Sequence, residues 1–200
     1  MTKKEHILKV AEEEFCKYGF DAVSMNDLVK KLDINKATIY YHFKDKKNLY
    51  QTIIKNALEK SNTNIKAIFE EKEEHKTLLE AYVEAIVITI KENPNIVSLS
   101  LHELANFSAN IDESFIPYIQ EAINLLEKVL EELKLKEEYK DMDIHTLFAF
   151  INGTIQTFYA IQMSTLPIGE NKELKHNSEK TLNYISYFVS NIILDAIVKK

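Results

Sequence analysis

Arginine is absent from this sequence of 200 residues, so its 25 strongly basic residues are all lysines. Glycine and proline are scarce, with three of each, whereas leucine, isoleucine, glutamate and lysine are abundant. Because glycine and proline interrupt helices and the abundant residues favour them, the composition indicates an all-α fold. The length is sufficient for one or two domains with a well-buried core.

Cysteine and long apolar runs are also nearly missing. Cys16 is the only cysteine, which excludes an intrachain disulfide and suits a reducing cytoplasm. A redox-sensing thiol is an alternative, but the place of Cys16 in an apolar helical stripe favours a packing role. No stretch approaches the roughly 20 uncharged apolar residues that span a bilayer. Acidic residues interrupt residues 1–15, unlike a secretory signal. We therefore expect a cytoplasmic protein without a membrane partner.

Residues 24–49 have the pattern of two short helices joined by a tight turn. Ser24 is a favourable N-terminal cap for the first helix, and Asn35 is one for a second helix over residues 36–42. Asp33 falls between them, where the chain often needs a left-handed residue and where Asp is better tolerated than most. The segment therefore predicts a helix, a turn and a second helix.

The second of these helices has one inward and one outward face. Ile39 and Phe43 have the spacing of residues that pack against a core. The residues left facing outward are Lys36, Thr38, Tyr41 and His42. This layout is typical of a helix-turn-helix, in which the second helix enters the major groove of DNA with its N-terminal residues toward the base edges.

Residues 38–43, Thr-Ile-Tyr-Tyr-His-Phe, followed by Lys46, resemble the T-[LI]-Y-x-H-F-x-x-K signature of the tetracycline-repressor (TetR/AcrR) family. Ser24, Leu28 and Val29 resemble the T-x-x-x-I-A start of the family's second helix. The first helix of the family ends in a glycine-aromatic pair. A similar pattern is present here at Ile7, Ala11, Phe15, Gly19 and Phe20.

In motif form the resemblance covers residues 5–49, and the remainder agrees in length and helical pattern. The chain departs from the family pattern at two positions. Asp33 stands where the family usually has a turn glycine, and Ala37 stands where a glycine usually precedes the threonine. The methyl group of Ala37 lies where the backbone is expected to approach DNA, so the base contacts are expected to differ in detail.

The resemblance implies a three-helix DNA-binding domain at residues 1–47 and a helical effector-binding and dimerisation domain at residues 48–200. It also implies that Tyr40 and His42 contact phosphates and that Lys46 anchors a phosphate at the start of the fourth helix. The predicted DNA-binding residues are Ser24, Asn35, Lys36, Ala37, Thr38, Tyr40, Tyr41, His42, Lys44 and Lys46.

The charge is distributed unevenly. The net charge of the chain is −6, but residues 1–50 carry +2 and residues 30–47 alone carry +4, while residues 51–200 carry −8. Such asymmetry would orient the N-terminal part toward DNA, although charge alone fits an ordinary solvated lysine face equally well.

The absence of arginine limits how bases can be recognised. Lysine reaches guanine O6 and N7 as a flexible point charge, without the planar fork of arginine. Lys36 is the candidate for a guanine contact, and Thr38 can meet a thymine methyl group or a phosphate. We expect backbone contacts and DNA shape to supply a larger share of recognition. An A·T-rich genome, which favours lysine codons, would also explain the composition.

Beyond the motif, apolar periodicity predicts six further helices, for about nine in total. Their approximate ranges are 45–69, 77–92, 95–107, 112–134, 143–164 and 178–198. The last two are apolar over more than one stripe, so the surplus must meet a deep core or a partner subunit. The resemblance implies a homodimer formed by these two helices. The predicted interface residues are Phe148, Ile151, Ile155, Phe158, Tyr184, Tyr187, Phe188 and Ile192.

Several polar residues stand within these apolar helices and need partners, and a small molecule is one such partner. Neighbouring aromatic residues are consistent with a hydrophobic effector, although core packing explains them equally well. The predicted effector-pocket residues are Tyr82, Thr89, His102, Asn106, Phe107, Phe148, Asn152, Gln156 and Tyr159.

The sequence contains no pattern typical of an enzyme or a metal site. The six histidines form no close ligand pair such as H-x-x-x-H. Phosphate loops, nucleophile elbows and dinucleotide fingerprints are absent from the sequence. We therefore expect no cofactor, no metal and no catalytic residues.

These observations predict a homodimeric repressor that binds a palindromic operator in double-stranded DNA and is released by a small hydrophobic effector. In the alternative, the fold is the same but no small molecule releases the protein from DNA. In that case the protein would be a DNA-bound scaffold or nucleoid-associated factor that acts through a protein partner.

Overall fold

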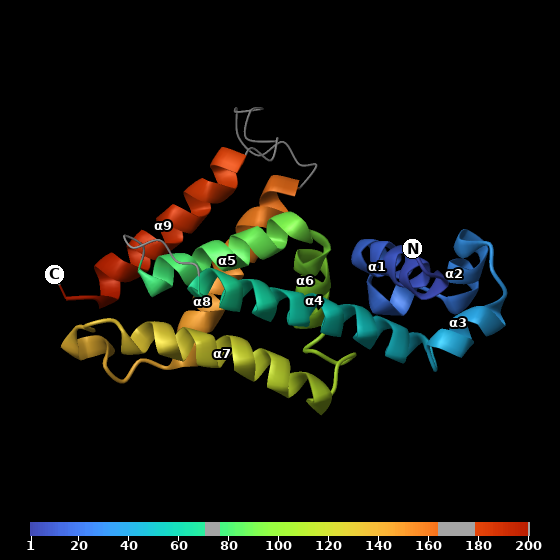
Figure 1. Ribbon diagram of the computed structural model, residues 1–200, viewed down its shortest axis with the longest axis horizontal. Coiled ribbons are helices and arrows are strands. Elements are labelled where there is room, and N and C mark those ends of the chain that lie inside the picture. Colours follow the sequence, from blue (N-terminus) through green and yellow to red (C-terminus); the bar gives the residue numbers. More distant parts are fainter. Residues whose placement is uncertain (71–76, 164–178, 200) are drawn as a thin grey trace. The chain divides into compact units, whose positions relative to one another are not determined.

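The computed structural model describes residues 1–70, 77–163 and 179–199. Over these ranges the chain forms nine α-helices and no strand (Figure 1). The helices are α1 (Lys3–Ala22), α2 (Met25–Leu32), α3 (Lys36–His42), α4 (Lys46–Glu70), α5 (Leu78–Glu92), α6 (Asn95–Ala105), α7 (Ile116–Glu131), α8 (Ile144–Met163) and α9 (Glu179–Ile197). The predicted all-α fold is confirmed. None of these described helices combines the length and apolar composition needed to cross a bilayer.

The helix predicted over 112–134 is shorter in the structure. A 3-10 turn at Glu113–Phe115 precedes α7, and the Asp112 carboxylate caps this turn by accepting a hydrogen bond from the Ser114 amide at 3.0 Å. Pro117 lies in the first turn of α7, where its missing N–H has no intrahelical partner to lose. The helix ends predicted at Ser164 and Ser178, and the loop between them, lie outside the described residues.

The chain divides into two compact units. The first comprises Met1–Glu59 and Asn93–Tyr118, and therefore holds α1, α2, α3, the first part of α4, and α6. The second comprises the described residues of Lys60–Glu92 and Ile119–Lys200. These units are defined by which residues pack together. The boundary predicted after residue 47 instead separates DNA binding from effector binding and dimerisation, and it stays a prediction.

One hydrophobic cluster holds the first unit together. Phe15 of α1 and Tyr50 of α4 are fully buried, and their rings meet edge to face with centroids 4.9 Å apart. Ile39 and Phe43, at α3 and its end, are buried in the same cluster. Burial of each such side chain contributes roughly 1.5–3 kcal/mol. The cluster therefore fixes α3 relative to α1 and α4.

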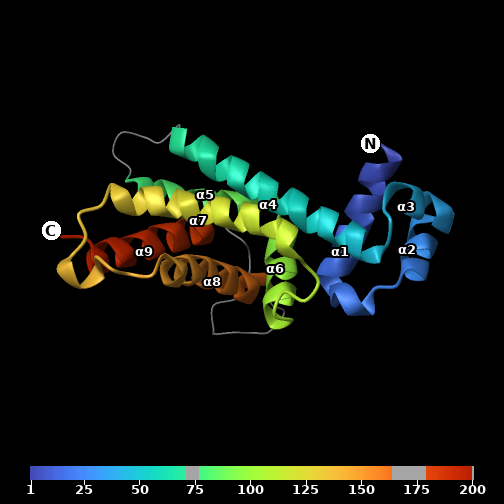
Figure 2. The same ribbon diagram turned by 90° about the horizontal axis from the view of Figure 1, so that it is seen from below.

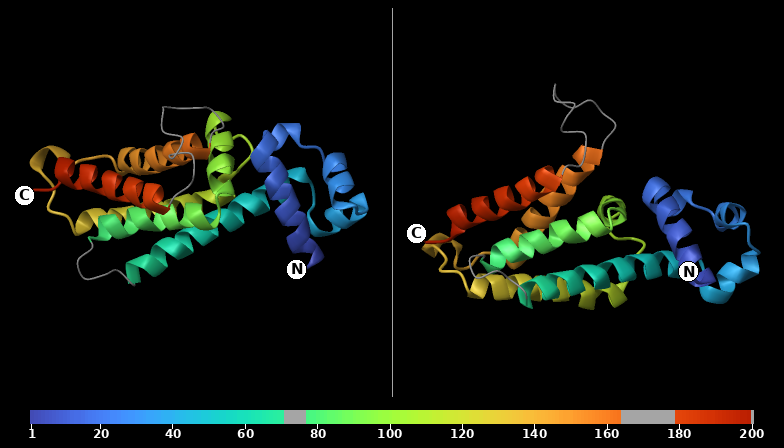
Figure 3. Two further views of the ribbon diagram at one scale, coloured as in Figure 1. Left: turned by 90° about the horizontal axis from the view of Figure 1, so that it is seen from above. Right: turned by 45° about the horizontal axis from the view of Figure 1, so that its top comes forward.

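A buried polar bridge joins α4 to α6 inside the first unit. The Tyr50 hydroxyl donates a hydrogen bond to Oε1 of Glu103 at 2.7 Å, and Asn110 Nδ2 donates to the same oxygen at 3.0 Å. Burial and the Glu103 carboxylate raise the pKa of Tyr50 above its ordinary value, so the hydroxyl keeps its proton. α6 also lies beside α1 (Figure 3). These contacts explain why α6 belongs to the first unit.

Helix α5 is the centre of the second unit. It packs against α8 and α9, which lie side by side in Figure 2. Its start is a capping box in which the Thr77 hydroxyl accepts from the Glu80 amide at 3.2 Å and Glu80 accepts from the Thr77 amide at 2.7 Å. Its buried residues are Leu79, Ala81, Tyr82, Val83, Ala85, Ile86, Val87, Thr89 and Ile90. A helix buried around most of its circumference is typical of a bundle core.

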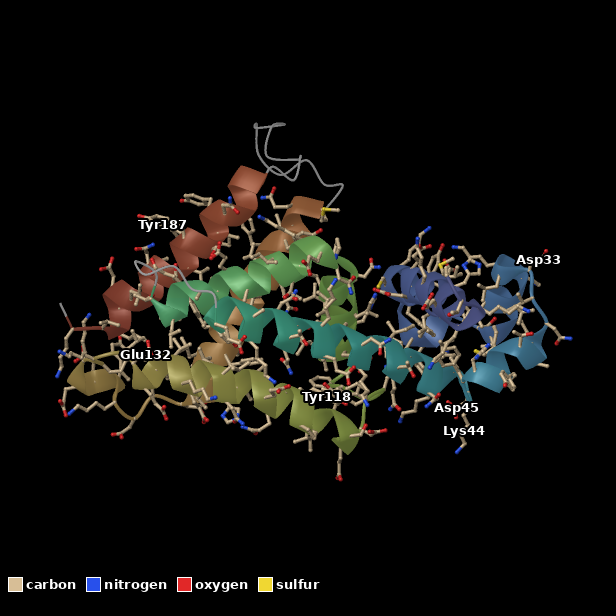
Figure 4. The ribbon with its side chains drawn as sticks, viewed as in Figure 1. Asp33, Lys44, Asp45, Tyr118, Glu132 and Tyr187 are labelled. Atoms are coloured by element: carbon tan, nitrogen blue, oxygen red, sulfur yellow. The ribbon has the colours of Figure 1, made fainter. Side chains whose placement is uncertain are left out.

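The turn between α2 and α3 generates a stability prediction. Asp33, labelled in Figure 4, has a φ of +49°, a left-handed conformation that disfavours residues with a β-carbon. We expect Asp33→Gly to raise the free energy of unfolding by about 1 kcal/mol, and Asp33→Val to lower it by at least about 1 kcal/mol. Both variants remove the same charge, so their difference in urea-melt midpoints isolates the backbone conformation. Equal midpoints would contradict the assignment of strain to this residue.

Candidate nucleic-acid interface

Side-chain caps set the start of both helices of the helix-turn-helix. The Ser24 hydroxyl accepts a hydrogen bond from the Asp27 amide at 3.2 Å and donates to the Asp27 carboxylate at 2.5 Å. Asn35 Oδ1 accepts from the Ala37 amide at 2.9 Å. Each cap satisfies an amide that would otherwise lack a partner at the helix start. Both caps were predicted from the sequence, and both side chains lie at the surface.

The seven residues of α3 have the two predicted faces. Ile39 is fully buried, and Phe43, which follows the helix, is nearly so. Lys36, Ala37, Tyr40 and Tyr41 are exposed, while Thr38 and His42 are half-buried. A short helix with few internal hydrogen bonds depends on such packing for its stability. The cluster of the first unit thus holds α3 by one side and leaves the other side open.

The two tyrosines of α3 differ in exposure. Tyr41 is 84% exposed and Tyr40 is 43% exposed, so Tyr40 is the ring that packs partly on the protein. The ring of Tyr41 meets that of His42 edge to face, with centroids 5.1 Å apart. Both hydroxyls lie outside the hydrophobic core, which suits hydrogen bonds to an external acceptor.

Lys36 lies at the start of α3 and is held by two neighbours. Its Nζ donates a hydrogen bond to Oδ1 of Asn26 at 3.0 Å and lies 5.8 Å from the centroid of the Tyr40 ring. Asn26 is the second residue of α2 and is also exposed. Sequence reasoning missed Asn26, because nothing in the spacing of ten residues indicates that the two side chains meet.

Lys44 and Lys46 flank the start of α4 (Figure 4 labels Lys44 and Asp45). Asp45 is a cap, as predicted, because its Oδ1 accepts from the Asn48 amide at 2.7 Å. Lys46 Nζ lies 4.2 Å from the centroid of the Phe20 ring. Burial lowers the pKa of Lys46 from its ordinary value, and the nearby Asp21 carboxylate opposes that shift. Lys44 is exposed.

The other lysines of this region are not equivalent. Lys31 forms an ion pair of 2.5 Å with Glu14 of α1, so its charge is partly neutralised within the protein. Lys30 and Lys47 are exposed.

Cys16, in the middle of α1, is half-buried, and burial raises the pKa of its thiol to about 12. An unionised thiol is a poor redox sensor, which supports the packing interpretation.

The predicted effector-pocket residues fall in both units. His102, Asn106 and Phe107 belong to the first unit, and the other six belong to the second. His102 Nε2 lies 3.2 Å from the Cys16 carbonyl, and its ring leaves only 3.4 Å for a β-carbon at Gly19, whose φ is +77°. The positive φ favours glycine at position 19, and a β-carbon there would contact the His102 ring. Asn106 is exposed, and Phe107 is 95% exposed.

The six predicted pocket residues of the second unit are either buried or half-buried. Tyr82 is fully buried, which raises its pKa, while a hydrogen bond from Asn152 lowers it by a smaller amount. Thr89 donates to the Ala85 carbonyl of its own helix at 2.9 Å. Gln156 Oε1 is buried and has no hydrogen-bond partner among the described residues. Phe148 is half-buried and Tyr159 is nearly fully buried.

The predicted dimer residues also divide by exposure. Ile151 and Ile155 of α8 are fully buried within the second unit, and Phe148 and Phe158 are half-buried. Tyr187 of α9 is 67% exposed and points outward in Figure 4. The other exposed large apolar side chains of α8 and α9 are Phe150, Ile161, Met163, Tyr184, Phe188 and Ile192.

Within the described ranges, no three potential ligand side chains gather as a metal site would require.

Known proteins resemble this chain most clearly at its N-terminus. Residues 7–53 match the family described as bacterial regulatory proteins, tetR family. The HTH-type transcriptional regulator QacR of Staphylococcus aureus (strain Mu50 / ATCC 700699) is 43% identical over 54 residues, which are 27% of this chain and 29% of QacR. The biofilm operon icaADBC HTH-type negative transcriptional regulator IcaR of Staphylococcus aureus (strain Newman) is 31% identical over 78 residues, 34% of this chain and 42% of IcaR. The chain thus spans less than half the length of these curated relatives.

Solved structures resemble the whole chain in fold. The ketosteroid transcriptional regulator KstR2 of Mycobacterium tuberculosis has a TM-score of 0.64 and 17% identity, over 100% of this chain and 96% of that one. A mutant of HlyIIR has a TM-score of 0.65 and 25% identity, over 98% and 97% of the two chains. The curated relatives are transcriptional regulators and not enzymes, in agreement with the sequence prediction. Residues 7–53 thus match the tetR family of bacterial regulatory proteins, and the chain as a whole shares its fold with solved transcriptional regulators.

Proposed function

We propose that the protein is a sequence-specific DNA-binding transcriptional regulator that acts as a homodimeric repressor and is released from DNA by a small hydrophobic molecule. The observation that carries the proposal is the outward face of α3. Lys36, Tyr40 and Tyr41 lie exposed on a helix whose opposite face is fixed by Ile39 and Phe43. A short helix presented in this way fits the major groove. The relatives QacR and IcaR are named as transcriptional regulators, which supports the same function.

The surroundings of α3 suit the phosphate backbone on either side of the groove. Lys44 and Lys46 stand at the start of α4, and the exposed Lys30 stands on α2. Cations placed on both sides of a recognition helix fix its position on the duplex without sequence information. Ser24 and Asn35 are surface caps whose polar groups can also meet phosphates. We propose these residues, with Ala37, Thr38 and His42, as the DNA-binding set.

The exposed apolar side chains of α8 and α9 support dimerisation. Tyr184 and Phe188 stack with ring centroids 5.8 Å apart on the surface of α9, next to Tyr187. Large aromatic side chains gathered on one face mark a protein interface. Ile151 and Ile155 are already buried within the protomer, so we leave them out of the proposed interface. A two-fold dimer would carry two recognition helices to the two halves of a palindrome.

The buried polar groups of the second unit support a ligand. Gln156 Oε1 is buried without a hydrogen-bond partner in the part of the chain that the structure describes, and such burial is costly unless a ligand donates a hydrogen bond to it. Asn152 and Tyr82 lie in the same unit and are bonded to other groups. We propose that the effector is a mainly apolar molecule with a hydrogen-bond donor that reaches Gln156. Release requires that this molecule bind the DNA-free conformation more tightly.

Fluorescence anisotropy of the purified protein tests the regulator directly. The probes are the intergenic DNA upstream of its own coding sequence and a scrambled DNA of equal length, at two salt concentrations. We expect saturable binding that prefers the upstream DNA, with two protomers or a multiple of two per site. Equal binding to both DNAs that collapses with salt would contradict the proposal. Many dispersed genomic sites together with a protein partner would favour the scaffold function instead.

Lys46→Met tests the phosphate anchor. The variant keeps an apolar stem over Phe20 and removes the charge, so the first unit should remain folded. We expect weaker binding to all DNA sequences alike and a salt slope flatter by about one unit per bound protomer. Lys128→Met, on α7 of the second unit, is the control and should leave both quantities unchanged. Altered sequence preference in Lys46→Met would contradict a phosphate-only role.

Tyr187→Glu tests the dimer. A carboxylate in the centre of an apolar interface would be desolvated without a partner, so the dimer should dissociate. Light scattering coupled to size exclusion should report half the mass of the unmodified protein. Phe107→Glu places the same charge at an exposed aromatic position of the first unit and should leave the mass unchanged. A Tyr187→Glu protein with the full dimer mass would overturn the proposed interface.

Gln156→Leu tests the unpartnered oxygen in the absence of ligand. Replacing a buried acceptor that has no donor by an apolar group of similar size should raise the free energy of unfolding by about 1 kcal/mol. Gln120→Leu, at an exposed position of α7, serves as the control and should change it by less than about 0.5 kcal/mol. Urea denaturation measures both. A loss of stability in Gln156→Leu would mean that the oxygen has a donor in the folded protein.

A further inference from the structure

The starting observation is the hydrogen bond between Lys36 and Asn26. It joins the first residue of α3 to the second residue of α2, with Nζ and Oδ1 3.0 Å apart. Both side chains are exposed, and both stand on the surface that the proposed function turns toward DNA. Asn26 has no role in the DNA-binding set proposed above. Its position beside Lys36 nevertheless places two hydrogen-bonding groups at the end of α3 that faces the bases.

The bond changes what Asn26 can recognise. A free asparagine recognises adenine with two hydrogen bonds, because its Oδ1 accepts from N6 and its Nδ2 donates to N7. In this protein Oδ1 already accepts from Lys36. Oδ1 keeps a second lone pair, but the positive charge of the Lys36 ammonium beside it repels another donor such as adenine N6–H. The groups that the pair offers to a base are therefore the two N–H groups of Nδ2 and the remaining N–H groups of the ammonium.

Donors alone match guanine. Guanine offers two acceptors, O6 and N7, in the major groove, whereas adenine offers one acceptor and one donor. An ammonium and an amide N–H side by side would satisfy both guanine acceptors and would face the adenine N6 donor unfavourably. The chain has no arginine to supply this paired contact from one side chain. Two side chains joined by a hydrogen bond supply it instead.

Neighbouring residues limit the movement of the pair. Met25, which precedes Asn26, is buried in the same cluster as Ile39, and so α2 and α3 are anchored to one core. The ring of Tyr40 lies 5.8 Å from Lys36 Nζ, one turn along α3, and attracts the ammonium to that side of the helix. Side chains on packed helices with a shared neighbour lose less entropy on binding than free ones.

We propose that Lys36 and Asn26 form one base-recognition unit that selects guanine, and that the bond from Lys36 prevents Asn26 from recognising adenine. The proposal rests on the proposed DNA-binding function and adds its specificity. It differs from a guanine contact by Lys36 alone in one consequence: removal of the lysine ammonium should create a new preference for adenine, because Asn26 Oδ1 is then free.

Selection from a randomised double-stranded DNA library, read by sequencing, tests the pair with the full-length protein. The variants are Lys36→Met, which keeps the stem over Tyr40, Asn26→Ala, and both together. The unmodified protein should prefer guanine at one position of each half-site. Lys36→Met should change that position to adenine, with the guanine-to-adenine ratio altered by at least about tenfold. Asn26→Ala should weaken the guanine preference without gaining adenine, and the double variant should have no preference there.

Lys128→Met is the control, because it removes the same charge from an exposed position of α7, outside the proposed DNA-binding set. It should leave the selected sequence unchanged. Two results would overturn the base-recognition pair: effects of Lys36→Met and Asn26→Ala at different base pairs, or a loss of affinity that is equal for all sequences. Neither result would contradict sequence-selective DNA binding by the unmodified protein. An unmodified protein that selects no sequence at all would instead overturn the proposed function. Thermal melts of each variant confirm that the exposed substitutions leave the fold unchanged.

Discussion

Burial of Ile39 and Phe43 in the cluster that includes Phe15 and Tyr50 is the interaction on which the presentation of α3 depends. A seven-residue helix is too short to be stable on its own in water. Packing by one face supplies the missing stability and also sets which residues face outward. The first helix of the chain and the fourth are needed for the same reason, since each contributes one of the two buried aromatic rings.

The same cluster extends to α6 through Tyr50, whose hydroxyl is bonded to the buried Glu103. His102, the preceding residue, lies against the carbonyl of Cys16 in α1. α6 is therefore part of the unit that presents α3. The chain passes between the two units at residues 59–60, 92–93 and 118–119. Along the chain, α6 lies between the second and the third of these connections.

Local patterns predicted much of this arrangement because they depend on near neighbours in sequence. The caps at Ser24 and Asn35 and the inward spacing of Ile39 and Phe43 required only helix geometry. The Lys36–Asn26 bond depends on how two helices cross, which periodicity does not contain. The burial of Glu103, the contact of His102 with the Cys16 carbonyl of α1 and the exposure of Phe107 likewise follow from tertiary packing. For the same reason, the pocket and dimer residues stay proposals.

Protection of guanine N7 against methylation by dimethyl sulfate tests the central claim most directly, because N7 lies in the major groove. The DNA would be a sequence selected by the full-length protein. The account predicts protected guanines in two symmetric half-sites, about one helical turn or a multiple of it apart. Unprotected guanine N7 atoms, together with protection of adenine N3 in the minor groove, would contradict docking of α3 in the major groove.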